Sequence, residues 1–141
     1  MSTRTRPSSP AHGGRPARPR FFALMKASTA FLSATLLVQG ITAGQLLSDG
    51  GSRELHHATG PVVTVAMVLQ IVAAFLVWRA GRGSARHLAV SAILLVLISV
   101  QFVLGGSGDL AVHVPLGMAL FGASAVMVAQ VWSPRPGRTA G

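Results

Sequence analysis

Cysteine is missing from all 141 residues, and acidic residues number only three. Without cysteine the chain has no disulfide, no thiolate metal site, no cysteine nucleophile and no covalently attached c-type haem. Charged residues make up 11% of the chain, whereas an ordinary soluble domain has about a quarter. Hydrophobic residues, at 50%, take their place. This composition argues against a soluble domain and favours a membrane protein.

Twelve Lys and Arg residues give the chain a formal net charge of +9. Such a charge is often a sign of nucleic-acid binding, but that function needs basic side chains on a folded polar face. Here they lie in the terminal segments and in short loops, between long apolar runs. We therefore expect the lipid bilayer as a partner and no nucleic acid.

Four apolar runs predict an all-α integral membrane protein with four transmembrane helices. The expected helices cover about residues 21–47, 56–78, 88–104 and 110–132. Each is close to the ~20 residues that a helix needs to cross ~30 Å of hydrocarbon. The helices form a transmembrane domain at 21–132. Residues 1–20, rich in Pro, Arg, Ser and Gly, are expected to be a disordered basic cytoplasmic arm, and residues 133–141 a cytoplasmic tail.

The distribution of charge predicts the orientation of the chain. Every basic residue except Arg53 falls on the side of the two termini, and the acidic residues all fall on the other side: Asp49, Glu54 and Asp109. The positive-inside rule then places both termini in the cytoplasm. Trp78 and Trp132 would lie at the cytoplasmic ends of their helices as interfacial anchors. We expect a multi-pass protein of the plasma membrane.

The second half of the chain repeats features of the first half. Gln39 lies near the outer end of the first helix and is followed five residues later by Gly44. Gln101 has the same position on the third helix and is followed by Gly106. Two helices restore the direction of the chain, so the repeats are parallel and are related by an axis along the membrane normal. The fold class is therefore an up-down bundle made of two parallel two-helix repeats.

The second and fourth helices each open with histidine. His56 is followed four residues later by Gly60, and His113 by Gly117. Because the repeat axis places equivalent residues at equal depth, we expect a histidine from each helix to meet near the outer face. His57 lies about 100° round the helix from His56, and the sequence alone leaves open which of the two points inward.

Helical phase supports an inward direction for these histidines. The residues below each of them on the same face are small, apolar or mildly polar, and they suit close helix packing or a flat ligand better than lipid. Below His56 they are Gly60, Val63, Met67 and Gln70. Below His113 they are Gly117, Leu120, Ser124 and Met127.

A pair of histidines inside a four-helix bundle points to a haem site. Ionisable residues within a span usually face the bundle interior and have a function, and bundles hold cofactors between facing helices. Two neutral imidazoles fill both axial positions of a haem iron. We expect one b-type haem with iron ligands His113 and either His56 or His57. Gly60 and Gly117 would let the macrocycle approach, and Gln39 and Gln101 would hydrogen-bond a propionate or the ligand imidazoles.

Other interpretations of the same residues remain open. The histidines could sit at the membrane interface and contact water or lipid headgroups. A zinc site would need Glu54 to join the histidines. A cofactor-free packing or assembly module would use the small-residue faces around Gly40, Gly44, Gly105, Gly117 and Gly122 to bind partner helices. A transporter half that dimerises has only the parallel repeat in its favour.

Three segments resemble the heme A synthase family. Residues 100–106, Val-Gln-Phe-Val-Leu-Gly-Gly, resemble that family's Gln…Leu-Gly-Gly segment of an odd-numbered helix. Residues 54–57, Glu-Leu-His-His, resemble the Glu-then-His-Arg opening of its second helix, and His113 resembles the histidine that opens its fourth. Members have eight helices in two four-helix bundles, each with a histidine pair on its even helices. Residues 27–132 would match one such bundle.

The departures from the family decide what the resemblance implies. If His56 is the ligand, His57 stands where the family has arginine, although the spacing from Glu54 favours His57 as the ligand. The first outer loop lacks the family's cysteines, and these 141 residues hold helices for one bundle only. The resemblance therefore implies haem binding rather than enzymatic oxygenation. The expected role is electron transfer or haem handling, with a membrane redox or respiratory partner or a second copy of the chain.

Overall fold

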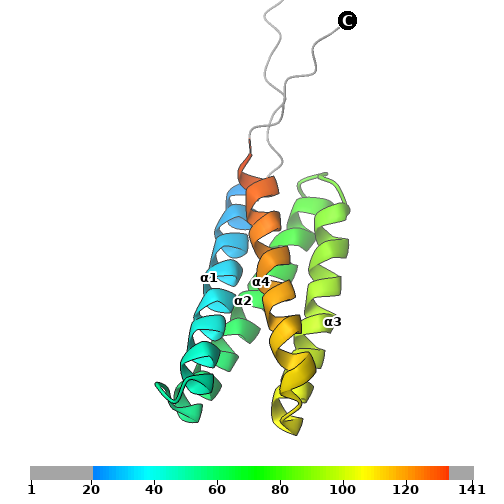
Figure 1. Ribbon diagram of the computed structural model, residues 1–141. Helices are drawn as coiled ribbons and strands as arrows, with labels where there is room; N and C mark the ends of the chain where they lie inside the picture. The colour runs from blue at the N-terminus through cyan, green and yellow to red at the C-terminus, as the bar shows by residue number, and fades with distance from the viewer. Residues whose placement is uncertain (1–20, 134–141) are drawn as a thin grey trace, which may run out of the picture.

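The computed structural model describes residues 21–133, and that part of the chain folds into four α-helices. They are α1 (Phe22–Leu47), α2 (Arg53–Arg79), α3 (Arg86–Ser107) and α4 (Leu110–Trp132), as Figure 1 shows. The prediction of an all-α chain with four helices is confirmed for these residues. The arm predicted at residues 1–20 lies outside the described residues, as does the predicted tail apart from Ser133.

Two helices extend beyond the apolar runs of the sequence. α2 begins at Arg53 rather than His56, because the Ser52 hydroxyl caps it by accepting a hydrogen bond of 3.1 Å from the backbone N–H of Leu55. α3 continues to Ser107, and Gly108 ends it with a φ of 77°, which glycine adopts readily. The apolar run marks the part of a helix that suits lipid, whereas the caps mark where the helix ends.

The helices lie side by side in a four-helix bundle. α1 packs against α2 and α4, and α3 packs against the same two helices, so α2 and α4 lie diagonally opposite each other. In Figure 1 α1 begins at the top of the view, and α4 ends there. We call the lower end, with residues 48–52 and 108–109, the histidine end. The upper end, where α1 begins and α4 finishes, is the terminal end.

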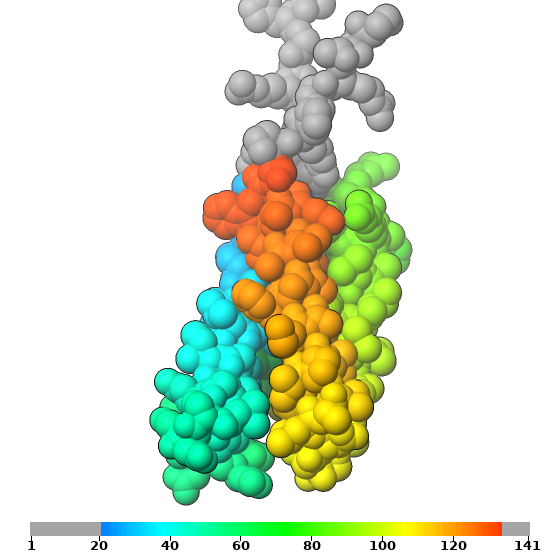
Figure 2. All heavy atoms as spheres, viewed as in Figure 1, coloured from blue at the N-terminus to red at the C-terminus, as the bar shows by residue number. Residues whose placement is uncertain are grey.

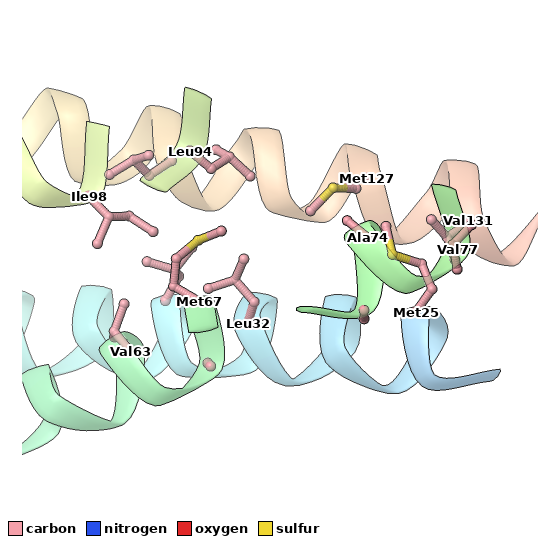
Figure 3. Close-up of a cluster of buried hydrophobic side chains, with 14 residues drawn as sticks. Met25, Leu32, Val63, Met67, Ala74, Val77, Leu94, Ile98, Met127 and Val131 are labelled. Carbon is pink, nitrogen blue, oxygen red and sulfur yellow. The ribbon is translucent and has the colours of Figure 1, made fainter. Parts of the chain in front are cut away.

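The apolar core occupies the terminal end and the middle of the bundle. Figure 3 shows methionine, leucine, valine and isoleucine side chains from all four helices meeting there. Toward the histidine end, the last buried hydrophobic residues of the described chain are Leu36, Val63, Ile98 and Leu120. Each lies about ten residues, or roughly 15 Å, from the histidine end of its helix. Fully buried hydrophobic side chains therefore stop well short of that end, and packing there is by partly buried residues such as Leu116.

A buried amide links all four helices within this core. Gln70 of α2 is fully buried, and its Oε1 accepts a hydrogen bond of 2.8 Å from the Ser28 hydroxyl of α1. Its Nε2 donates to the Ser91 hydroxyl of α3 at 3.1 Å, and lies 3.7 Å from the sulfur atoms of both Met25 and Met127. Polar side chains of this kind hold helices together where water is excluded.

The surface of the bundle is apolar over most of its length. Val103 and Met118 are each 72% exposed, and Val96 is 62% exposed. All four helices are long and apolar enough to cross a membrane, and large exposed apolar surfaces are rare on soluble monomers. At the terminal end the Lys26 ammonium lies 4.7 Å from the centre of the Trp132 ring. The four long apolar helices and their exposed apolar side chains are those of a multi-pass membrane protein.

Candidate functional site

His56 of α2 and His113 of α4 face each other across the histidine end. Their ring centres are 6.3 Å apart, and the ring planes meet at 81°. Both residues are half-buried, and each lies about one helical turn from the end of its helix. The two diagonal helices therefore bring one histidine each to the same level of the bundle.

His113 is held by α3 through its side chain and its backbone. Its Nδ1 lies 3.1 Å from the backbone oxygen of Gln101, and the Gln101 Nε2 donates to the backbone oxygen of His113 at 2.7 Å. A carbonyl oxygen only accepts hydrogen bonds, so Nδ1 carries the proton. In the neutral ring Nε2 then has the free lone pair. Gly105 makes room for this ring, because a Cβ there would lie 2.9 Å from the His113 Cε1.

His56 is held by α1 through a threonine hydroxyl. Its Nδ1 lies 2.9 Å from the Oγ1 of Thr42, a buried residue. Thr59 lies one turn further along α2 and donates its hydroxyl to the backbone oxygen of His56 at 2.9 Å. The ring of His56 is thus fixed by a neighbouring helix, as the ring of His113 is.

His57 is the more exposed of the two adjacent histidines. It is exposed, and its ring stands edge-on to that of His56, with the centres 6.2 Å apart. Between the two candidates that the sequence left open, the structure turns His56 toward His113. No cluster of three or more His, Cys, Asp or Glu suited to a metal ion is found among residues 21–133. The zinc interpretation with Glu54 therefore has no geometric support among these residues.

The glycines of the even-numbered helices face neighbouring side chains. A Cβ on Gly60 would lie 3.2 Å from the Phe102 ring and 3.7 Å from the Gln39 Nε2. A Cβ on Gly117 would lie 2.9 Å from the Gln101 Nε2. Both glutamines predicted for the site therefore lie beside these glycines, Gln101 in direct contact with His113 and Gln39 near Gly60.

One polar atom in this region has no hydrogen-bond partner. The Oε1 of Gln101 is buried and unpaired, while the Nε2 of the same amide is fixed by the backbone of His113. Leaving a buried acceptor without a donor costs about 1–3 kcal/mol. The histidine end therefore contains an acceptor that a ligand group or a water molecule would satisfy.

Three residues of this region were not predicted as part of the haem site, namely Thr42, Gly105 and Phe102. Thr42 and Phe102 carry no signal of their own, because threonine and phenylalanine are ordinary residues of membrane helices. Gly105 belongs to the segment that resembles the heme A synthase family, but sequence reasoning gave it no contact with His113. These contacts depend on how neighbouring helices pack.

Comparisons with known proteins add no relative. No family model, no curated protein and no solved structure matches this chain.

Proposed function

We propose that this chain is an integral membrane protein that binds one b-type haem between His56 and His113. The observation that carries this proposal is the meeting of the two imidazoles across the bundle, beyond the end of the apolar core. A bound haem would supply one-electron redox chemistry at this site. The chain would then serve electron transfer or haem handling, with a membrane redox or respiratory partner.

The spacing of the rings agrees with axial ligation of one iron. Two imidazoles on opposite sides of a metal ion have ring centres about 6 Å apart, because each metal–nitrogen bond is about 2 Å and each ring nitrogen lies about 1 Å from its ring centre. The observed separation is 6.3 Å. His113 also keeps a lone pair on Nε2 in its neutral form, because its Nδ1 donates to the backbone of α3.

The surroundings of the pair also suit a flat apolar group. The fully buried hydrophobic side chains of the described residues end about 15 Å short of the histidine end, so a macrocycle would add apolar contacts where the side chains are only partly buried. In Figure 2 a furrow runs between the lower halves of α1 and α4. The unpaired Oε1 of Gln101 would accept a hydrogen bond from a protonated propionate or a bound water. Gly60 and Gly117 carry no side chain of their own, and the Phe102 ring and the amides of Gln39 and Gln101, which lie beside them, would have to move to admit the macrocycle.

We propose an up-down bundle of two parallel repeats with both termini in the cytoplasm, which would place the histidine end at the outer face of the plasma membrane. The positive charges on the terminal side support this orientation. The resemblance to one bundle of the heme A synthase family is consistent with a histidine pair on the even-numbered helices.

Haem titration of the purified full chain in detergent tests this function. We expect the wild-type protein to bind one haem with a low-spin spectrum and sharp α and β bands after reduction by dithionite. His56→Ala and His113→Ala each remove one axial ligand and should abolish the low-spin spectrum. His57→Ala is the matched control, because His57 is the adjacent and exposed histidine, and it should behave like the wild type. Unchanged spectra in His56→Ala or His113→Ala would overturn the pairing.

A second candidate function is a cofactor-free assembly module. Gly40 and Gly44 lie four residues apart on α1, and a Cβ at either would meet nothing within 4 Å. A face of this kind suits close packing of a partner helix or a second copy of the chain. The haem titration separates the two functions, since the assembly module would take up no haem.

A further inference from the structure

Thr42 is a buried threonine of α1 whose hydroxyl makes two contacts. The Oγ1 lies 2.9 Å from the His56 Nδ1 and 3.1 Å from the backbone oxygen of Gln39, and the residue is 6% exposed. The first contact joins α1 to α2, and the second stays within α1. The directions of these two hydrogen bonds decide which nitrogen of His56 is protonated.

The hydroxyl has only one proton to share between its two contacts. The backbone oxygen of Gln39 can only accept, so the Thr42 hydroxyl donates to it and accepts a hydrogen bond from the Nδ1–H of His56. In the reverse arrangement the hydroxyl would donate to His56 and two oxygen atoms would face each other at 3.1 Å with no proton between them. The arrangement that satisfies both contacts leaves Nε2 of the neutral ring with its lone pair.

The two histidines reach this tautomer by different routes. His113 donates to a backbone oxygen of α3, which no side-chain substitution removes. His56 depends on one hydroxyl. The difference comes from a position at which the two repeats are not alike. Thr42 lies three residues after Gln39, whereas Leu104, which has no hydroxyl, lies three residues after Gln101.

We infer that Thr42 is a positioning residue that holds His56 in the Nδ1–H tautomer and so presents Nε2 to the haem iron. This inference rests on the proposed function and adds to it a residue that touches neither iron nor macrocycle. A hydrogen bond to the outer nitrogen of a metal-bound histidine fixes the ring and raises its basicity as a ligand. Losing that bond weakens the ligand and makes the ferric state less favourable.

The test compares three threonine variants of the full chain in detergent. Thr42→Val removes the hydroxyl at nearly constant volume, and Thr42→Ser keeps it. Thr35→Val is the matched control, because Thr35 is also buried on α1 and donates to the oxygen three residues earlier, that of Leu32, at 2.9 Å. We expect Thr42→Val to weaken haem binding by about 10- to 100-fold and to shift the midpoint potential to more positive values. Thr42→Ser and Thr35→Val should stay close to the wild type.

A second readout does not need haem. ¹⁵N NMR of histidine-labelled protein, at a pH where the rings are neutral, distinguishes the two tautomers of His56. We expect Nδ1–H in the wild type and in Thr42→Ser, and a mixture in Thr42→Val. Equal haem affinity of Thr42→Val and Thr35→Val, or an Nε2–H tautomer in the wild type, would overturn the inference. A wild-type protein that takes up no haem would overturn the proposed function, while the NMR spectra would still decide the role of Thr42.

Discussion

The two proposed ligands differ at the scale of single residues. His56 is held by a side-chain hydroxyl of α1, whereas His113 is held by the backbone of α3 and rests on Gly105. A Cβ at Gly105 would lie 2.9 Å from the Cε1 and 3.3 Å from the Nδ1 of His113. The shorter of these distances is closer than real Cβ contacts come, so the ring would have to move.

Gly105→Ala should therefore displace His113. We expect a loss of stability of about 1–3 kcal/mol, measured by unfolding in detergent, together with weaker haem binding. Gly106→Ala is the control, since a Cβ there would meet nothing within 4 Å. Equal stability and equal haem binding of the two variants would show that His113 does not depend on the space at Gly105.

The sequence predicts which residues face the bundle interior better than it predicts which residues of other helices contact them. Helical phase identifies His56 and His113 as candidates because periodicity is a property of one helix. It does not identify Thr42, because the α1 residue that contacts His56 depends on the distance and rotation between α1 and α2. For the same reason the choice between His56 and His57 needed the structure.

At the scale of helices, the residues predicted to lie below each histidine on the inward face are buried or half-buried in the structure. Gly60, Val63, Met67 and Gln70 are buried on α2. On α4, Leu120, Ser124 and Met127 are buried and Gly117 is half-buried. The sequence also placed Gln70 on the inward face, but it did not reveal the hydrogen bonds that Gln70 makes to Ser28 and Ser91, since these join three different helices.

Gln70→Leu should loosen the bundle at its terminal end. The substitution removes hydrogen bonds to α1 and α3, and we expect it to cost about 1 kcal/mol of stability, a common value for interhelical hydrogen bonds in membranes. Gln130→Leu is the control, because Gln130 is exposed on α4 at the same end. The measurement is unfolding in mixed detergent, and a stability of Gln70→Leu equal to that of Gln130→Leu would contradict a role for Gln70 as a link between helices.

At the scale of the whole molecule, the two ends of the bundle differ in composition. The terminal end holds the apolar core and the Gln70 link, whereas the histidine end holds imidazoles, amides and glycines. The four helices and their rough extent could be predicted from the apolar runs. The stopping point of the core could not, because it depends on how closely the helices approach one another.

Labelling of single cysteines tests the proposed orientation. The chain has no cysteine of its own, so Ser48→Cys, Ser84→Cys and Ser107→Cys each create one site, and all three serines are exposed. In intact cells, a membrane-impermeant maleimide should label the cysteines at 48 and 107, at the histidine end. It should label the cysteine at 84 only after permeabilisation. The opposite pattern would place the histidine end in the cytoplasm.

Haem binding by His56 and His113 is tested most simply by the absorption spectrum of the purified wild-type protein, oxidised and then reduced with dithionite, after haem has been added. We predict one haem per chain, with the sharp reduced α and β bands of an iron held by two imidazoles. A preparation that shows no Soret band after haem addition would contradict haem binding by this protein.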